Sequence, residues 1–112
     1  MLRRSYNGTL QGHAGAPANW TLNVTVAPGT HQVDVTASWH RLGPAIQLEV
    51  VLANGTTVAG SVPGNYPFSG ASVHPGGAWL QVVLTSEVTE AFEVKVEQRT
   101  LSQTVIRPNL LD

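Results

Sequence analysis

The chain has 112 residues, which suits one domain with a single hydrophobic core. Apolar residues make up 42% of it and charged residues only 12%, so we expect a globular protein whose surface is largely Thr, Ser, Asn and Gln. The net charge of −1 and the lack of any basic cluster beyond Arg3-Arg4 exclude nucleic-acid binding, and no stretch approaches the ~20 apolar residues of a membrane span.

The first predicted strands lie in the N-terminal part of the chain. Residues 6–10 are a weak candidate, whereas 20–26 and 33–39 alternate apolar and polar side chains with the two-residue period of a half-buried strand. Pro28-Gly29 suits the middle of a turn, because Pro presets φ and Gly tolerates a positive φ. We therefore expect the two alternating strands to pair as a hairpin.

Further strands follow at intervals of about ten residues, with turn signals between them. They are predicted at 46–52, 58–59, 68–73, 80–84 and 92–96. Asn54-Gly55 is a strong hairpin signal, and we expect Val58 to lie opposite inward-facing Leu52. The pattern predicts an all-β fold: a single antiparallel β-sandwich, jelly-roll or immunoglobulin-like, with about 7–9 strands. One domain, 1–112, would have its core at about 5–101 and a C-terminal tail at 102–112.

Catalytic and metal-binding motifs are not evident in the sequence. The chain has no Cys, and its four histidines do not have the spacing of metal ligands: His13, His31, His40 and His74. Most acidic residues alternate on outward strand faces, and there is neither a G-x-S-x-G motif nor a glycine-rich phosphate loop before a helix. We expect a protein that is not an enzyme, with no metal and no cofactor.

Partner contacts are expected in two segments. The longest irregular region, 60–77, is rich in Gly and Pro, so it is either a binding loop or a crossing between sheets. Trp20 and Trp39 are in phase with core residues, and we expect them to be buried. The candidate contact residues are Tyr66 and Phe68 in the loop, with Trp79 as a third sugar-stacking ring, and Val105, Ile106, Leu110 and Leu111 in the tail, which would dock on this domain, a partner or a following domain.

Four asparagines lie in N-x-Ser/Thr sequons: Asn7, Asn19, Asn23 and Asn54. They are candidate glycosylation sites if the protein is secreted by an organism with N-glycosylation. The alternative is that Thr is common on exposed strand faces and Asn-Gly in turns.

Four segments suggest a known domain type. They are Tyr6-Asn7-Gly8-Thr9-Leu10, Val26-Ala27-Pro28-Gly29-Thr30 before a strand ending in Trp39, Leu48 to Gly55, and Pro75-Gly76-Gly77-Ala78-Trp79. From Tyr6 to about Leu101 this layout resembles the prepeptidase C-terminal (PPC) domains appended to secreted subtilases and other hydrolases. The resemblance implies a non-catalytic jelly-roll sandwich that assists folding, stability or substrate adsorption. Many such domains have an Asp-Leu-Asp-Leu run that contributes to calcium binding, but Pro44 to Leu48 replaces it here, so no calcium role is implied.

These observations predict a structural subunit that acts through protein–protein contacts, as a virion coat or decoration protein or a surface filament subunit. Unpaired edge strands and the chain ends would add to the partner. The first alternative is a PPC-like accessory domain of a secreted protease or other hydrolase, and the second is a carbohydrate-binding module. Met1 to Arg4 is not followed by the apolar run of a signal peptide, so we expect either a domain of a longer secreted chain or a complete protein, at an extracellular location or a virion surface.

Overall fold

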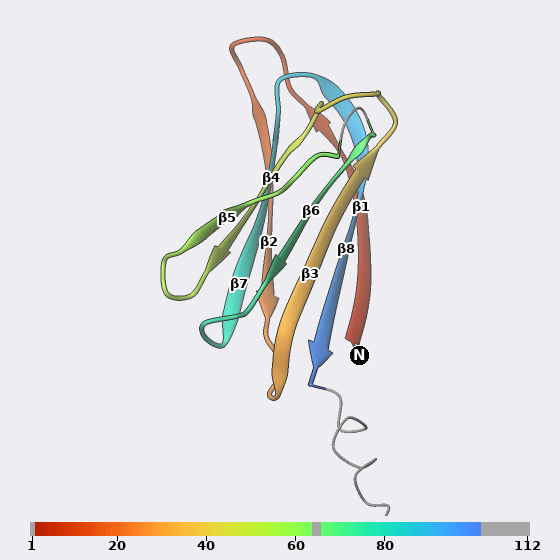
Figure 1. Ribbon diagram of the computed structural model, residues 1–112. Coiled ribbons are helices and arrows are strands. Elements are labelled where there is room, and N and C mark those ends of the chain that lie inside the picture. The colour runs from red at the N-terminus through yellow and green to blue at the C-terminus, as the bar shows by residue number, and fades with distance from the viewer. Residues whose placement is uncertain (1, 64–65, 102–112) are drawn as a thin grey trace, which may run out of the picture.

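The computed structural model describes residues 2–63 and 66–101, which form two four-stranded antiparallel sheets (Figure 1). The strands are β1 (Leu2–Gln11), β2 (Ala18–Thr25), β3 (Thr30–Trp39), β4 (Gln47–Leu52), β5 (Thr57–Ala59), β6 (Phe68–Val73), β7 (Trp79–Ser86) and β8 (Thr89–Thr100). Every strand expected from the sequence is present, including the weak first one. The predicted antiparallel β-sandwich is confirmed.

The strand order is nested. One sheet runs β1-β8-β3-β6 and the other β2-β7-β4-β5, so the first strand pairs with the last, the second with the seventh, the third with the sixth and the fourth with the fifth. The two sheets of four strands differ from an immunoglobulin constant domain, which has seven strands in sheets of four and three. No helix within the described residues could span a membrane.

The core fills the space between the sheets. Strand alternation sends every second side chain inward, as the sequence pattern predicts. The buried apolar residues are Leu10, Val24, Val33, Val35, Ala37, Trp39, Ile46, Leu48, Val50, Leu52, Val73, Leu80, Val82, Leu84, Phe92, Val94 and Val96. Trp20 is partly buried, with its ring centroid 5.1 Å from that of Phe92 and 6.3 Å from that of Tyr6. Both in-phase tryptophans therefore pack with the core, as expected.

The prediction that the two strands flanking Pro28-Gly29 pair as a hairpin is wrong. β2 pairs with β7 and β3 pairs with β8 and β6, so this turn carries the chain from one sheet to the other. Its local geometry is the expected one, because the Thr30 amide donates to the Ala27 carbonyl at 3.1 Å and Gly29 has φ of +85°. Turn chemistry thus fixed the reversal but not the sheet that each strand joins.

The buried side chain of Gln98 holds this crossing in place. Its Oε1 accepts hydrogen bonds from the Ala27 amide at 2.9 Å and the Thr30 hydroxyl at 3.1 Å. Its Nε2 donates to the Thr25 carbonyl at 3.1 Å. One amide on β8 therefore satisfies backbone groups that leave β2 and would otherwise lack a partner.

Gln98→Leu is expected to lower the free energy of unfolding by about 1–2 kcal/mol, because the substitution removes these hydrogen bonds and leaves partly buried backbone groups without their protein partner. Urea denaturation measures the effect. Gln47→Leu, at an exposed position of β4, is the matched control and should stay within about 0.5 kcal/mol of the wild type. Equal stability of the two variants would show that Gln98 does not hold the crossing.

The hairpin between β4 and β5 is confirmed, with a shifted register. Val58 lies opposite Val50 and not opposite Leu52, although it faces inward as expected. The Asn54 Oδ1 accepts from the Thr56 amide at 2.9 Å, and Gly55 has φ of +91°. Asn-Gly therefore supplies the expected turn.

Candidate binding surface

The outer face of the β1-β8-β3-β6 sheet carries a hollow of about 480 Å³. We call it the outer groove. Residues of the neighbouring strands β1, β8 and β3, with the residue that follows β3, line it at the end of the sheet where β3 finishes: Asn7, Thr9, Ser38, His40, Ala91 and Glu93. Hydroxyl and amide groups surround the small side chain of Ala91, which forms the floor of the groove. The surface therefore offers hydrogen bonds around an apolar floor.

Strand register brings these residues together from distant parts of the chain. Asn7 lies opposite Glu93, and Glu93 lies opposite Ser38. Ser38 in turn lies opposite Phe68 on β6. An amide, a carboxylate, a hydroxyl and an aromatic ring therefore form one row across the four strands.

Two aromatic rings stand at the β6 end of this row. Tyr66 and Phe68 are stacked, with ring centroids 6.4 Å apart and an angle of 28° between planes, and Tyr66 is 65% exposed. The backbone holds them in place, because the Trp39 amide donates to the Pro67 carbonyl at 2.9 Å. The structure thus places both predicted contact residues beside the outer groove and exposed to solvent.

Glu90 anchors the loop that follows β3. The side chain is buried, and its Oε2 accepts from the backbone amides of His40 at 2.9 Å and Arg41 at 3.1 Å. Its Oε1 accepts from the Arg41 guanidinium at 3.3 Å. Burial raises the pKa of Glu90, but the two amides and the guanidinium outweigh burial and bring the pKa below its ordinary value. His40, which lines the outer groove, is therefore positioned by a buried charge.

This role of Glu90 was not predicted from the sequence, because most acidic residues were expected to lie on outward strand faces as solubilising charges. A signal was present, since Glu90 has the same parity on β8 as Phe92 and Val94, which are buried. A carboxylate in phase with core residues indicates a buried acceptor that needs donors from elsewhere.

The opposite half of the same outer face holds a charge network. Arg99 pairs with Asp34 at 2.6 Å and with Glu97 at 3.0 Å, and Glu97 also pairs with Arg3 at 2.7 Å. Burial raises the pKa of Asp34, but hydrogen bonds from Ser72, Gln32 and Arg99 outweigh it and lower the pKa. Both carboxylates are engaged by donors of the same sheet, so they contribute to its structure.

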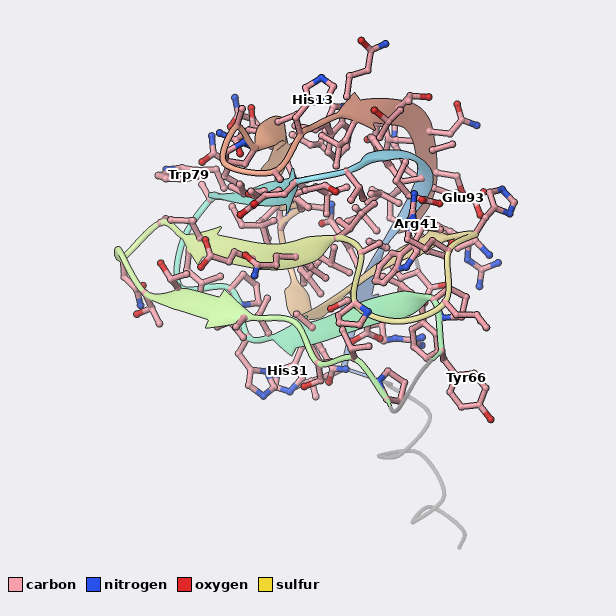
Figure 2. The ribbon with its side chains drawn as sticks, turned by 90° about the horizontal axis from the view of Figure 1, so that it is seen from above. His13, His31, Arg41, Tyr66, Trp79 and Glu93 are labelled. Carbon is pink, nitrogen blue, oxygen red and sulfur yellow. The ribbon has the colours of Figure 1, made fainter. Side chains whose placement is uncertain are left out.

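Trp79 does not join Tyr66 and Phe68. It lies on β7, in the other sheet, and Figure 2 shows it on the far side of the molecule from Tyr66. The three rings suggested as one sugar-stacking surface therefore do not form it. The tail residues Val105, Ile106, Leu110 and Leu111 lie outside the described residues.

All four sequon asparagines are exposed. Asn19 and Asn23 point outward from β2, Asn54 lies in the β4–β5 turn, and Asn7 lines the outer groove. Glycosylation at these positions stays a prediction, and a glycan on Asn7 would cover the groove.

The structure places two histidines together that the sequence leaves far apart. His31 and His74 have ring centroids 4.8 Å apart. Among residues 2–63 and 66–101, no group of three or more His, Asp or Glu is arranged to hold a metal ion.

No family model matches the chain, and no curated protein matches it. Among solved structures, it is similar to the pre-peptidase C-terminal domain of collagenase from Bacillus anthracis, with a TM-score of 0.61 and 15% identity over 86% of this chain and 90% of that one. It also matches the enzymatically active domain of tailspike protein 4 of bacteriophage CBA120, with a TM-score of 0.48 and 14% identity over 87% of this chain and 18% of that one.

The chain has a PPC-like fold. The resemblance expected from four short segments is confirmed at the level of architecture, because the match to the collagenase domain extends over nearly the whole of both chains. At 15% identity the likeness concerns the fold alone.

Proposed function

We propose that the protein is a non-catalytic binding module that acts by contact with another protein, through the outer groove and the exposed aromatic pair beside it. The observation that carries the proposal is the row from Asn7 through Glu93 and Ser38 to Phe68, which combines hydrogen-bonding groups with an exposed ring. Tyr and Phe are enriched at protein interfaces, where an aromatic anchor surrounded by polar contacts supplies most of the binding energy.

Two kinds of protein would use such a contact surface. In the first, favoured by the PPC-like fold, the module is an accessory domain of a secreted protease or other hydrolase and holds the enzyme on a protein substrate. In the second, it is a subunit of a virion coat, decoration layer or surface filament and contacts its neighbours. Both settings are extracellular or on a virion surface, and both make the outer face the contact surface.

A carbohydrate ligand is the second candidate, and it rests on the stacked pair and the polar groups beside it. Tyr66 presents an exposed ring at the end of a row of hydroxyl, amide and carboxylate groups, the kind of surface on which a sugar ring packs and forms hydrogen bonds. Because Trp79 lies elsewhere, the sugar surface has two rings and not three.

Adsorption assays test the proposal. The purified chain is incubated with insoluble fibrous protein and, separately, with insoluble polysaccharide, and its depletion from solution is measured. Ala91→Arg fills the floor of the outer groove, whereas Thr21→Arg adds the same side chain to the outer face of the other sheet. We expect adsorption to fibrous protein to fall at least about tenfold for Ala91→Arg and to be unchanged for Thr21→Arg, because losing contacts worth about 1.4 kcal/mol weakens binding tenfold.

The alternatives give different results. Adsorption to polysaccharide alone, lost in Tyr66→Ala, would replace the protein partner with a carbohydrate. Self-association that Ala91→Arg abolishes, measured by light scattering after size-exclusion chromatography, would favour the coat or filament setting. Equal behaviour of Ala91→Arg and Thr21→Arg in every assay would refute the outer groove as the contact surface.

A further inference from the structure

The paired histidines lie at the opposite end of β3 from the outer groove. His31 is next to the first residue of β3, whereas Trp39, which lines the groove, is its last residue. His74 directly follows β6, and the pairing of Val33 with Val73 brings the two histidines together. Both side chains are exposed, their ring centroids are 4.8 Å apart and their planes are inclined by 51°.

One hydrogen bond settles which nitrogen of His74 is available. The Nδ1 atom of His74 lies 3.0 Å from the backbone carbonyl oxygen of His31. A carbonyl oxygen only accepts, so Nδ1 carries the proton and donates it. The lone pair of the neutral ring is then on Nε2. Metal-binding histidines are held in this way, with one ring nitrogen donating to a carbonyl and the other facing the ion.

The separation of the rings suits one shared ion. Two imidazoles that bind a tetrahedral ion at about 2.0–2.1 Å from each nitrogen have ring centres about 5 Å apart. The observed 4.8 Å is within a few tenths of an ångström of that value.

We propose that His31 and His74 form a site for a divalent transition-metal ion, of the class of Zn²⁺, Ni²⁺ or Cu²⁺. Neutral imidazole suits these ions, whereas Ca²⁺ and Mg²⁺ take oxygen ligands. The two rings supply two ligands, and water completes the coordination. The site is independent of the proposed function, because it lies at the other end of the sandwich.

Isothermal titration calorimetry of the untagged chain with ZnCl₂, NiCl₂ and CaCl₂ tests the site. We expect one Zn²⁺ or Ni²⁺ per chain and no binding of Ca²⁺. His31→Ala and His74→Ala should each weaken Zn²⁺ binding on the order of tenfold or more, since each removes one of two protein ligands. His13→Ala and His40→Ala, at the two other histidines, are the matched controls and should bind like the wild type.

Several results would overturn the proposal. They are equal Zn²⁺ affinity in all four histidine variants, no Zn²⁺ binding by the wild type, and Ca²⁺ binding as tight as Zn²⁺ binding. His74→Gln, which keeps a polar side chain of similar size, must lose affinity as His74→Ala does. Circular dichroism confirms that each variant is folded. Ala91→Arg should leave Zn²⁺ binding unchanged, so the failure of either proposal can be recognised separately.

Discussion

Gly12→Ala is expected to lower the free energy of unfolding by at least about 3 kcal/mol, the largest effect of any substitution considered for this chain. A Cβ atom on Gly12 would lie 2.0 Å from the carbonyl oxygen of Ser86 and 2.8 Å from its carbonyl carbon. Both atoms are backbone, so no side-chain rotation relieves the clash. The Gly12 amide also donates to the Val88 carbonyl at 3.1 Å, which fixes the two segments together.

Urea denaturation of the variant measures this cost, and Gly70→Ala provides the matched control. A Cβ on Gly70 meets its nearest neighbour, the Val35 carbonyl oxygen, only at 3.7 Å, and the residue has no positive φ. Its substitution should change stability by less than about 0.5 kcal/mol. A Gly12→Ala protein as stable as Gly70→Ala would show that the turn between β7 and β8 can move away from β1.

Glu90→Gln is expected to lower the free energy of unfolding by about 2–3 kcal/mol. The buried carboxylate accepts three hydrogen bonds from His40 and Arg41. A hydrogen bond to a charged acceptor contributes about 1.5–3 kcal/mol to stability. Gln keeps one acceptor oxygen but places an NH₂ group among donors. The loop after β3 then loses its anchor, so partner binding at the outer groove should weaken together with stability.

The pH dependence gives this prediction a second measurement. Because the folded-state pKa of Glu90 is lowered, its contribution is fully present above the unfolded pKa of about 4.3 and is lost as the pH falls through the folded pKa. The stability difference between wild type and Glu90→Gln should therefore be constant near neutral pH and shrink below about pH 4.3. A pH-independent difference would mean that the charge of Glu90 does not stabilise the loop.

The strands could be predicted because alternation is a local property. The pattern from Trp20 to Val26 and from Val33 to Trp39 identifies each strand and its inward face, and the structure has both. The alternation pattern does not show with which strand each of them pairs. Pro28-Gly29 makes the same tight reversal within a sheet or between sheets, and contacts with β8 and the Gln98 side chain, about seventy residues away, decide between the two.

The candidate sites depend even more on pairing. Tyr66 and Phe68 could be proposed because they are aromatic residues in a Gly/Pro-rich segment, but Asn7, Ser38 and Glu93 become neighbours only through the order β1-β8-β3-β6. His31 and His74 meet for the same reason, 43 residues apart in the chain. Their separation in sequence matches no local ligand spacing, so the rule that excluded a histidine site could not detect them.

The position of β8 between β1 and β3 governs when the chain can fold. β1 emerges from the ribosome before the other described strands, yet its partner in the sheet is the last of them to be made. Until residues 89–100 have been synthesised, β1 has no neighbour and β3 lacks one of its two. The sandwich therefore assembles after translation of its final strand, and the long loops that must close first favour slow folding.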